Sequence, residues 1–221
     1  MPVDPVTFLV LGHSFIRRLR DYLQQNSANS RANNLDDSRP TCYGPNLRLS
    51  PTEFSILFHG VGGLTVHRAC AETDIVAHIR PQAIFIQLRE KDIDSHRSVQ
   101  SIHLNVTKLL DDIYSTFPSV TAVFWGQLLP RLHTRIDPTV YSNKLHALNQ
   151  LLKATDRHKF HYWPHFGFWK DSQLLFSSDG IHLNSRGQHL LARSIRGATL
   201  RYRAISAVRS VACLPDSQSL R

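Results

Sequence analysis

Short apolar segments of strand length alternate along this chain with longer segments of helical periodicity. The strand-like segments are Val6 to Leu11, Phe54 to Phe58, Ala83 to Leu88, Val120 to Trp125 and Lys159 to Trp163. Most are nearly continuous in apolar residues, which is typical of strands buried on both faces of a sheet. Helices between consecutive strands indicate crossover connections and hence parallel pairing. The sequence therefore predicts an α/β protein, a three-layer α/β/α sandwich around a five-stranded, mainly parallel sheet.

Apolar residues at helical spacing identify the segments between the strands. They recur every three or four residues in 15–25, 102–117, 141–155 and 185–198, and a shorter pattern leads from Val66 to Ile75. This spacing places the apolar side chains on one face of each helix. We therefore expect helices that cover both faces of the sheet.

Length and composition are those of one globular domain. The 221 residues are 42% hydrophobic, which is enough to bury a substantial core. We assign residues 1–200 to this domain. Residues 26–51, rich in Asn, Ser, Arg, Asp and Pro, are predicted to form a polar loop or insertion. Residues 201–221 are predicted to form a basic, flexible C-terminal tail.

The cysteines and the apolar runs bear on the cellular compartment. Cys42, Cys70 and Cys213 are odd in number and widely spaced, so they indicate neither a disulfide framework nor a zinc site. The apolar runs are too short to cross a bilayer, and the first twenty residues lack the apolar core of a signal peptide. We expect an intracellular, cytoplasmic protein without a membrane span, a metal or a cofactor.

The chain is strongly basic. It has 26 lysines and arginines against 17 acidic residues, for a formal charge of +9. Such a balance favours association with nucleic acid or other polyanions. The basic residues are mostly scattered along the chain, which also fits ordinary solvated helix faces. Nucleic acid is therefore a candidate partner on charge alone.

Two segments at opposite ends of the chain supply a serine, an aspartate and a histidine. Gly12-His13-Ser14-Phe15 follows the first strand, and Asp179-Gly180-Ile181-His182 precedes the last helix. A hydroxyl nucleophile needs an imidazole to accept its proton and a carboxylate to orient that imidazole. Ligands of parallel α/β sheets lie beyond the carboxyl ends of the strands, where both segments can meet. Ser14, Asp179 and His182 are the candidate catalytic residues.

Each of these residues also has an ordinary structural explanation. Ser14 can cap the following helix, Asp179 can close an Asx turn, and His182 can lie on the surface. A helix N-terminus also favours an alkoxide-like nucleophile, so capping and catalysis are compatible for Ser14. Its N-terminal position, without the second glycine of Gly-x-Ser-x-Gly, separates this chain from the α/β-hydrolases.

The order of these segments resembles the sequence blocks of the SGNH hydrolases, also called GDSL-type esterases and lipases. Gly12 to Phe15 resembles the first block, Gly63 the glycine of the second, Arg89 to Asp92 the third, and Asp179 to His182 the fifth. The resemblance covers residues 6–200. It implies a flavodoxin-like SGNH hydrolase fold and a serine hydrolase that cleaves small-molecule or lipid-like acyl esters.

The resemblance also implies a role for each site residue. Ser14 would attack the acyl carbonyl and form an acyl-enzyme, His182 would shuttle the proton, and Asp179 would orient His182. The oxyanion hole would consist of the amides of Ser14 and Gly63 and a third donor. The family has an asparagine at that third position, and this chain has Lys91.

Three residues depart from the family pattern. The Lys91 ammonium can replace the asparagine as a donor, or the side chain can turn to solvent and leave a hole with two donors. Arg89 stands where the family has a glycine, and His13 stands where it has an aspartate that braces the nucleophile turn. Because loss of one oxyanion donor costs about 100- to 1,000-fold in turnover, these changes bear on catalysis.

These departures motivate a second hypothesis, a catalytically impaired SGNH fold that serves as a binding module, with nucleic acid as a candidate ligand. The sequences 60–63 and 179–187 are also similar, more loosely, to esterase-like domains of retroelement-derived proteins of animals. Residues 125–127 and the aromatic loop 166–169 are candidate pocket walls, although aromatic residues near strand ends more often pack in the core or in a lid.

Overall fold

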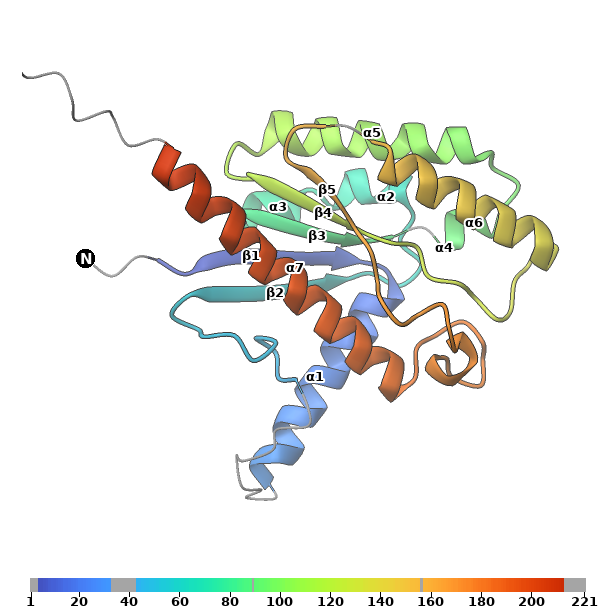
Figure 1. The fold of residues 1–221 in the computed structure, drawn as a ribbon, viewed down its shortest axis with the longest axis horizontal. Helices are drawn as coiled ribbons and strands as arrows, with labels where there is room; N and C mark the ends of the chain where they lie inside the picture. Colours follow the sequence, from blue (N-terminus) through green and yellow to red (C-terminus); the bar gives the residue numbers. More distant parts are fainter. Residues whose placement is uncertain (1–3, 33–42, 89, 156, 213–221) are drawn as a thin grey trace, which may run out of the picture.

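Five parallel strands form one sheet in the order β2-β1-β3-β4-β5 (Figure 1). The computed structural model describes residues 4–32, 43–88, 90–155 and 157–212. The strands are β1 (Val6–Gly12), β2 (Phe54–Gly60), β3 (Ala83–Gln87), β4 (Ala122–Gly126) and β5 (Phe160–Trp163). Every pairing is parallel, so the predicted mainly parallel sheet is in fact wholly parallel. The predicted α/β/α architecture is confirmed.

Helices cover both faces of this sheet. On one face lie α1 (Ser14–Ala32) and α7 (Ser185–Ala212), with the short 3-10 helix η2 (Ser172–Leu175) beside them. The other face is covered by α2 (Val66–Ala69), α3 (Asp74–Ile79), α4 (Glu90–Ile93), α5 (Val99–Thr116) and α6 (Pro138–Lys153), and η1 (Cys70–Glu72) lies between α2 and α3.

Successive side chains of strand β1 lie alternately in two hydrophobic cores, one on each face of the sheet. Phe8 and Val10 of β1 belong to the core beneath α1 and α7, whereas Leu9 and Leu11 belong to the core on the opposite face. All four side chains are almost fully buried. Each such side chain contributes roughly 1.5–3 kcal/mol on transfer from water, so both faces stabilise the sheet.

Side-chain caps mark where two of the covering helices begin. Ser98 Oγ accepts the Ser101 amide at the start of α5, at 3.1 Å. Asp137 Oδ1 accepts the amides of Thr139 and Val140 at the start of α6, and Pro138 occupies the first turn. These caps satisfy amides that no helical carbonyl can reach.

The predicted loop 26–51 is partly helical and partly buried. Helix α1 continues through Ala32, and residues 33–42 lie outside the described residues. Beyond that gap, Leu47 and Leu49 join the core. Asn46 Nδ2 donates to the carbonyls of Leu49 and Phe54, at 2.9 and 3.1 Å. The segment before β2 is therefore packed against the domain, since a polar composition does not prevent two leucines from anchoring it.

Helix α7 continues through Ala212, past residue 201, where the C-terminal tail was predicted to begin. Tyr202 is buried, its ring lies 6.3 Å from that of Phe8, and its hydroxyl is 2.8 Å from Thr121 Oγ1. Arg203 forms an ion pair with Glu53 at 2.5 Å. These contacts join Tyr202 and Arg203 to the domain. Residues 213–221 lie outside the described residues.

Candidate active site

Two glycines bring the start of α1 close to the ends of three strands. A Cβ on Gly12 would lie 2.5 Å from the backbone oxygen of Gln87, and one on Gly60 would lie 2.2 Å from the amide nitrogen of Arg17. Neither approach would be tolerated by a side chain. The first turn of α1 is consequently held against the carboxyl ends of β1, β2 and β3, with Ser14 at this edge.

Ser14 is the first residue of α1 and is partly exposed. Its Oγ lies 3.4 Å from Nδ1 of the neighbouring His13, which also accepts the Phe15 amide at 3.3 Å. The His13 ring is buried and packs against Phe15, with 4.7 Å between ring centroids. His13 therefore lies against the nucleophile turn and not on the surface.

Asp179 and His182 form a close pair in the turn before α7. Asp179 Oδ2 lies 2.6 Å from His182 Nδ1, and Oδ1 accepts the amides of Ile181 and His182 at 2.9 and 2.8 Å. One carboxylate thus closes an Asx turn and also binds the imidazole, so the two explanations considered for Asp179 coexist. Because a carboxylate only accepts, His182 Nδ1 carries the proton and Nε2 can act as an acceptor.

The Asp179 carboxyl is held in its ionised form. Desolvation by partial burial would by itself raise its pKa. The opposing hydrogen bonds from the His182 amide, the His182 ring and the Ile181 amide, together with the His182 charge, hold the pKa of Asp179 well below its usual range. An ionised carboxylate at this position keeps the imidazole in one tautomer and orientation.

The loop after β4 anchors this turn. His133 Nδ1 donates to the Asp179 carbonyl at 2.8 Å, and the amides of Leu132 and His133 donate to the Gly180 carbonyl at 2.8 and 3.2 Å. Gly180 has a φ of 64°, and a Cβ there would lie 2.6 Å from His133 Nδ1. His133 was not predicted from the sequence, because no motif links it to a turn 46 residues away.

Gly63 and Lys91 meet beside the nucleophile turn. Val61, just after β2, donates its amide to the Gly12 carbonyl at 2.9 Å, and Gly63 follows with a φ of 70°. A Cβ on Gly63 would lie 3.3 Å from Lys91 Nζ, so the ammonium lies next to this glycine although the Lys91 side chain is largely exposed. The next residue, Asp92, is buried and accepts the Val66 amide at 3.2 Å.

The structure brings the predicted site residues together in pairs. Asp179 contacts His182, and Lys91 lies next to Gly63, but no hydrogen bond joins Ser14 and His182 within the described part of the chain. Catalytic hydrogen bonds in unliganded enzymes are often long and tighten only when substrate binds. Arg89 lies outside the described residues.

The turn that carries His182 lies beside α1. Arg18 and Tyr22 of α1 line a pocket of about 470 Å³ together with Ser177, Leu183 and Ser185. Leu183 also shares a core with Phe15 and its neighbours. The segment that carries Ser14 and the turn that carries His182 are therefore close to each other at this edge of the sheet.

The described residues contain neither a cluster of metal-ligating side chains nor a membrane-spanning helix. No group of three or more His, Cys, Asp or Glu residues among them is placed to hold a metal ion. None of the helices within the described ranges combines the length and the apolar character needed to cross a bilayer.

Solved structures with similar folds include several ester hydrolases. An acetyl esterase mutant bound to acetate aligns over 89% of this chain and 97% of its own, with a TM-score of 0.60 and 19% identity. A psychrotrophic esterase from Pseudoalteromonas aligns over 90% and 98%, with a TM-score of 0.59 and 14% identity. An acetyl-xylooligosaccharide esterase from Geobacillus aligns over 88% and 94%, with a TM-score of 0.57 and 15% identity.

Sequence comparison adds no relative to these. No protein-family model matches the chain, and no curated protein matches it. The looser resemblance to retroelement-derived domains finds no support among the structural matches. The sheet order and the near-complete overlap with esterases and acylhydrolases agree with the fold implied by the sequence blocks. The chain has the SGNH hydrolase fold.

Proposed function

We propose that this protein is a serine hydrolase of the SGNH type that cleaves carboxylic esters. The observation that carries the proposal is the 2.6 Å contact between Asp179 and His182 in the turn before α7. In this fold, which several ester hydrolases share, an oriented imidazole at the nucleophile edge supports acyl transfer.

The reaction proceeds through an acyl-enzyme. Ser14 Oγ attacks the ester carbonyl while His182 Nε2 takes the hydroxyl proton. His182 then returns this proton to the departing alcohol, and Ser14 retains the acyl group. Water, deprotonated by His182, attacks the acyl-enzyme; as the bond between the acyl carbon and Ser14 Oγ breaks, His182 returns this proton to Ser14 and the carboxylic acid leaves. Asp179 stabilises the imidazolium that forms in each half of the cycle.

The developing oxyanion is bound by the amides of Ser14 and Gly63 and by the Lys91 ammonium. The position of Lys91 Nζ beside Gly63 supports this assignment over a hole with two donors. A charged donor makes a stronger hydrogen bond to an oxyanion than a neutral amide does. Lys91 would thus substitute for the asparagine of the family.

A small acyl ester is the proposed substrate class. Two of the similar structures are acetyl esterases by name, so acetyl esters are the first to test. A lipid-like acyl ester is also a proposed substrate, because the proposed catalytic groups act on the reacting carbonyl and not on the acyl chain.

The second candidate function is an SGNH fold that binds ligands without turnover. The observation that favours it is the Ser14 hydroxyl, whose hydrogen-bond partner among the described residues is His13 and not His182. The altered third block, with Lys91 in place of asparagine, points the same way.

Labelling with a fluorophosphonate probe separates the two candidates. The probe should label the purified full chain at Ser14, and Ser14→Ala should lose both labelling and hydrolysis of p-nitrophenyl acetate. Ser178→Ala, which alters an exposed serine in the turn beside Asp179, is the matched control and should keep both. Absence of labelling in protein with a cooperative unfolding transition would contradict the hydrolase and favour the binding module.

A further inference from the structure

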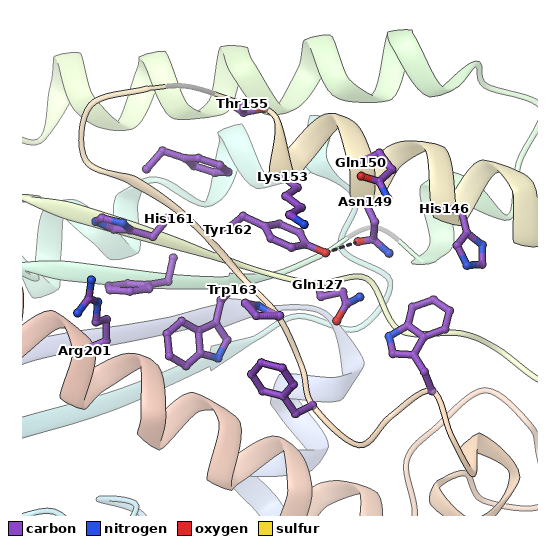
Figure 2. Close-up of a pocket in the computed structure, with 15 residues that line it drawn as sticks. Gln127, His146, Asn149, Gln150, Lys153, Thr155, His161, Tyr162, Trp163 and Arg201 are labelled. Atoms are coloured by element: carbon purple, nitrogen blue, oxygen red, sulfur yellow. Dashed lines mark hydrogen bonds between the residues drawn. The ribbon is translucent and has the colours of Figure 1, made fainter.

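A groove of about 850 Å³ runs along the open edge of the sheet, away from the Ser14 site. Strand β5 is last in the sheet order, so only one of its edges pairs with another of the described strands. Helix α6 and helix α7 contribute residues on either side of it (Figure 2). The groove therefore consists of segments that are distant in sequence.

Six of the fifteen residues that line this groove are aromatic. They are Phe124, Phe160, Tyr162, Trp163, Phe166 and Trp169. Phe166 is 78% exposed and Trp169 is 37% exposed, so neither contributes much to the core. Large apolar side chains held in a groove and left open to water mark a binding surface.

Two of these rings are held in place by polar contacts. The Trp163 indole donates to Ser194 Oγ on α7 at 3.0 Å. Burial raises the pKa of Tyr162 to about 12, so its hydroxyl stays protonated and donates to Asn149 Oδ1 on α6 at 3.4 Å. Rigid rings lose little conformational entropy when a flat ligand stacks on them.

The charged residues of the groove are all basic. Lys153 lies on α6 and Arg201 on α7, and both are exposed. The lining residues that the structure describes include no aspartate or glutamate, and no ion pair involves either cation within the described ranges. The same groove thus contains two cations without an ion-pair partner among the described residues and two exposed aromatic rings.

Amide side chains complete the lining. Gln127 follows β4, and Gln150 is exposed on the groove side of α6, near His146 (Figure 2). The neighbouring Asn149 side chain is already bonded to the Leu128 backbone and to the Tyr162 hydroxyl. Amides both donate and accept, as the edges of nucleobases do. The rings suit the face of a base, the amides its polar edge and the cations a phosphate.

We propose that this groove binds single-stranded nucleic acid. Bases would stack on the exposed rings of Phe166 and Trp169, and phosphates would contact Lys153 and Arg201. Single-strand sites combine a basic groove with aromatic platforms in this way. A neutral oligosaccharide would use the rings and amides but not the cations. A peptide strand added to β5 would find only four residues, followed by Pro164.

Fluorescence anisotropy of a labelled oligothymidylate of about 16 nucleotides tests the proposal. Phe166→Ala and Trp169→Ala should each weaken binding by at least about fivefold, the lower end of the effect of losing one stacked base. Lys153→Ser with Arg201→Ser should reduce the slope of log affinity against log salt by about 1.4, or about 0.7 for each phosphate that no longer has a cationic partner. Thermal unfolding of every variant identifies loss of binding that arises from misfolding.

The matched control removes the same charge elsewhere. Arg97→Ser with Lys108→Ser alters two exposed cations outside this groove and should preserve affinity and slope. Equal losses in both double variants would overturn the proposal in favour of nonspecific polyanion attraction. Binding that is unaffected by the aromatic variants, or a preference for heparin or a neutral xylo-oligosaccharide over the oligonucleotide, would also overturn it.

The groove and the hydrolase proposal can fail independently. Ser14→Ala should bind the oligonucleotide as the unaltered chain does, and Trp169→Ala should still react with the fluorophosphonate probe. Binding without labelling, or labelling without binding, therefore contradicts one proposal and leaves the other standing.

Discussion

His133 Nδ1 lies 2.8 Å from the carbonyl oxygen of Asp179, so the loop after β4 supports the turn that carries Asp179 and His182. The two residues are 46 positions apart. The adjoining amides of Leu132 and His133 bind the Gly180 carbonyl and reinforce this support. The orientation of the proposed imidazole base therefore depends on a segment with no recognisable motif.

Replacement of His133 should impair catalysis through this turn. His133→Ala removes one hydrogen bond, worth about 1 kcal/mol, and should lower kcat by about fivefold while KM changes little. His133→Asn retains a donor near the Nδ1 position and should recover most of the rate. His158→Ala, at an exposed histidine, is the control. Equal rates for the alanine and asparagine variants would show that the hydrogen bond does not position the turn.

Replacement of Lys91 tests the third oxyanion donor. Lys91→Met removes the ammonium beside Gly63 and should lower kcat by about 100- to 1,000-fold, whereas Lys91→Asn keeps a neutral donor of the family type and should retain most of kcat. Steady-state hydrolysis of p-nitrophenyl acetate measures both. A methionine variant with unchanged kcat would show that Lys91 is outside the hole.

Asp179→Asn should lower kcat by roughly 10,000-fold, because a neutral amide can stabilise the wrong imidazole tautomer and does not compensate an imidazolium. Labelling of Ser14 should slow in parallel. Asp171→Asn changes an exposed carboxylate upstream of this turn and serves as the control. A modest loss of rate in Asp179→Asn would contradict the role given to the 2.6 Å contact.

The same substitution should change how stability depends on pH. The folded pKa of Asp179 lies below the ordinary value of about 3.9, so its stabilising contribution is present above that value and is lost as pH falls through the folded pKa. The difference in unfolding free energy between the unaltered chain and Asp179→Asn should therefore shrink from about pH 5 to about pH 2. Denaturant unfolding across this range measures it. A constant difference would contradict the lowered pKa.

Tyr202 should stabilise the C-terminal part of α7. Tyr202→Phe removes the hydroxyl contact with Thr121 and should cost about 1 kcal/mol, whereas Tyr202→Ala also removes a buried ring and should cost about 3–5 kcal/mol. Arg201→Ala, one residue earlier and exposed, should have little effect on stability. Equal stability of all three variants would indicate that residues beyond 200 do not belong to the folded domain.

The architecture and the chemistry of the outer blocks were predictable from local sequence patterns. A continuous apolar run identifies a strand that is buried on both faces of a sheet. Leu9 and Val10 lie in such a run, and the structure buries them in opposite cores. The pairing of Asp179 with His182 was also predictable, because three residues in one turn bring the two side chains together. Local spacing is enough to specify such features.

The helix ends were less predictable. Arginines interrupt the apolar pattern of α7 after residue 198, so composition favoured a tail, yet Tyr202 packs against Phe8 and the helix continues. The segment before β2 similarly has a polar composition, but Leu47 and Leu49 are buried. Tertiary burial of a few side chains outweighs local propensity at such boundaries.

Long-range packing specifies which distant groups meet. Lys91 reaches Gly63, His133 holds Asp179, and β5 brings α6 and α7 to one aromatic groove. Each of these contacts spans many residues of chain, and its geometry follows from strand order and helix placement. Local periodicity contains no information about the order of the strands in the sheet. These contacts could therefore be identified only from the tertiary structure.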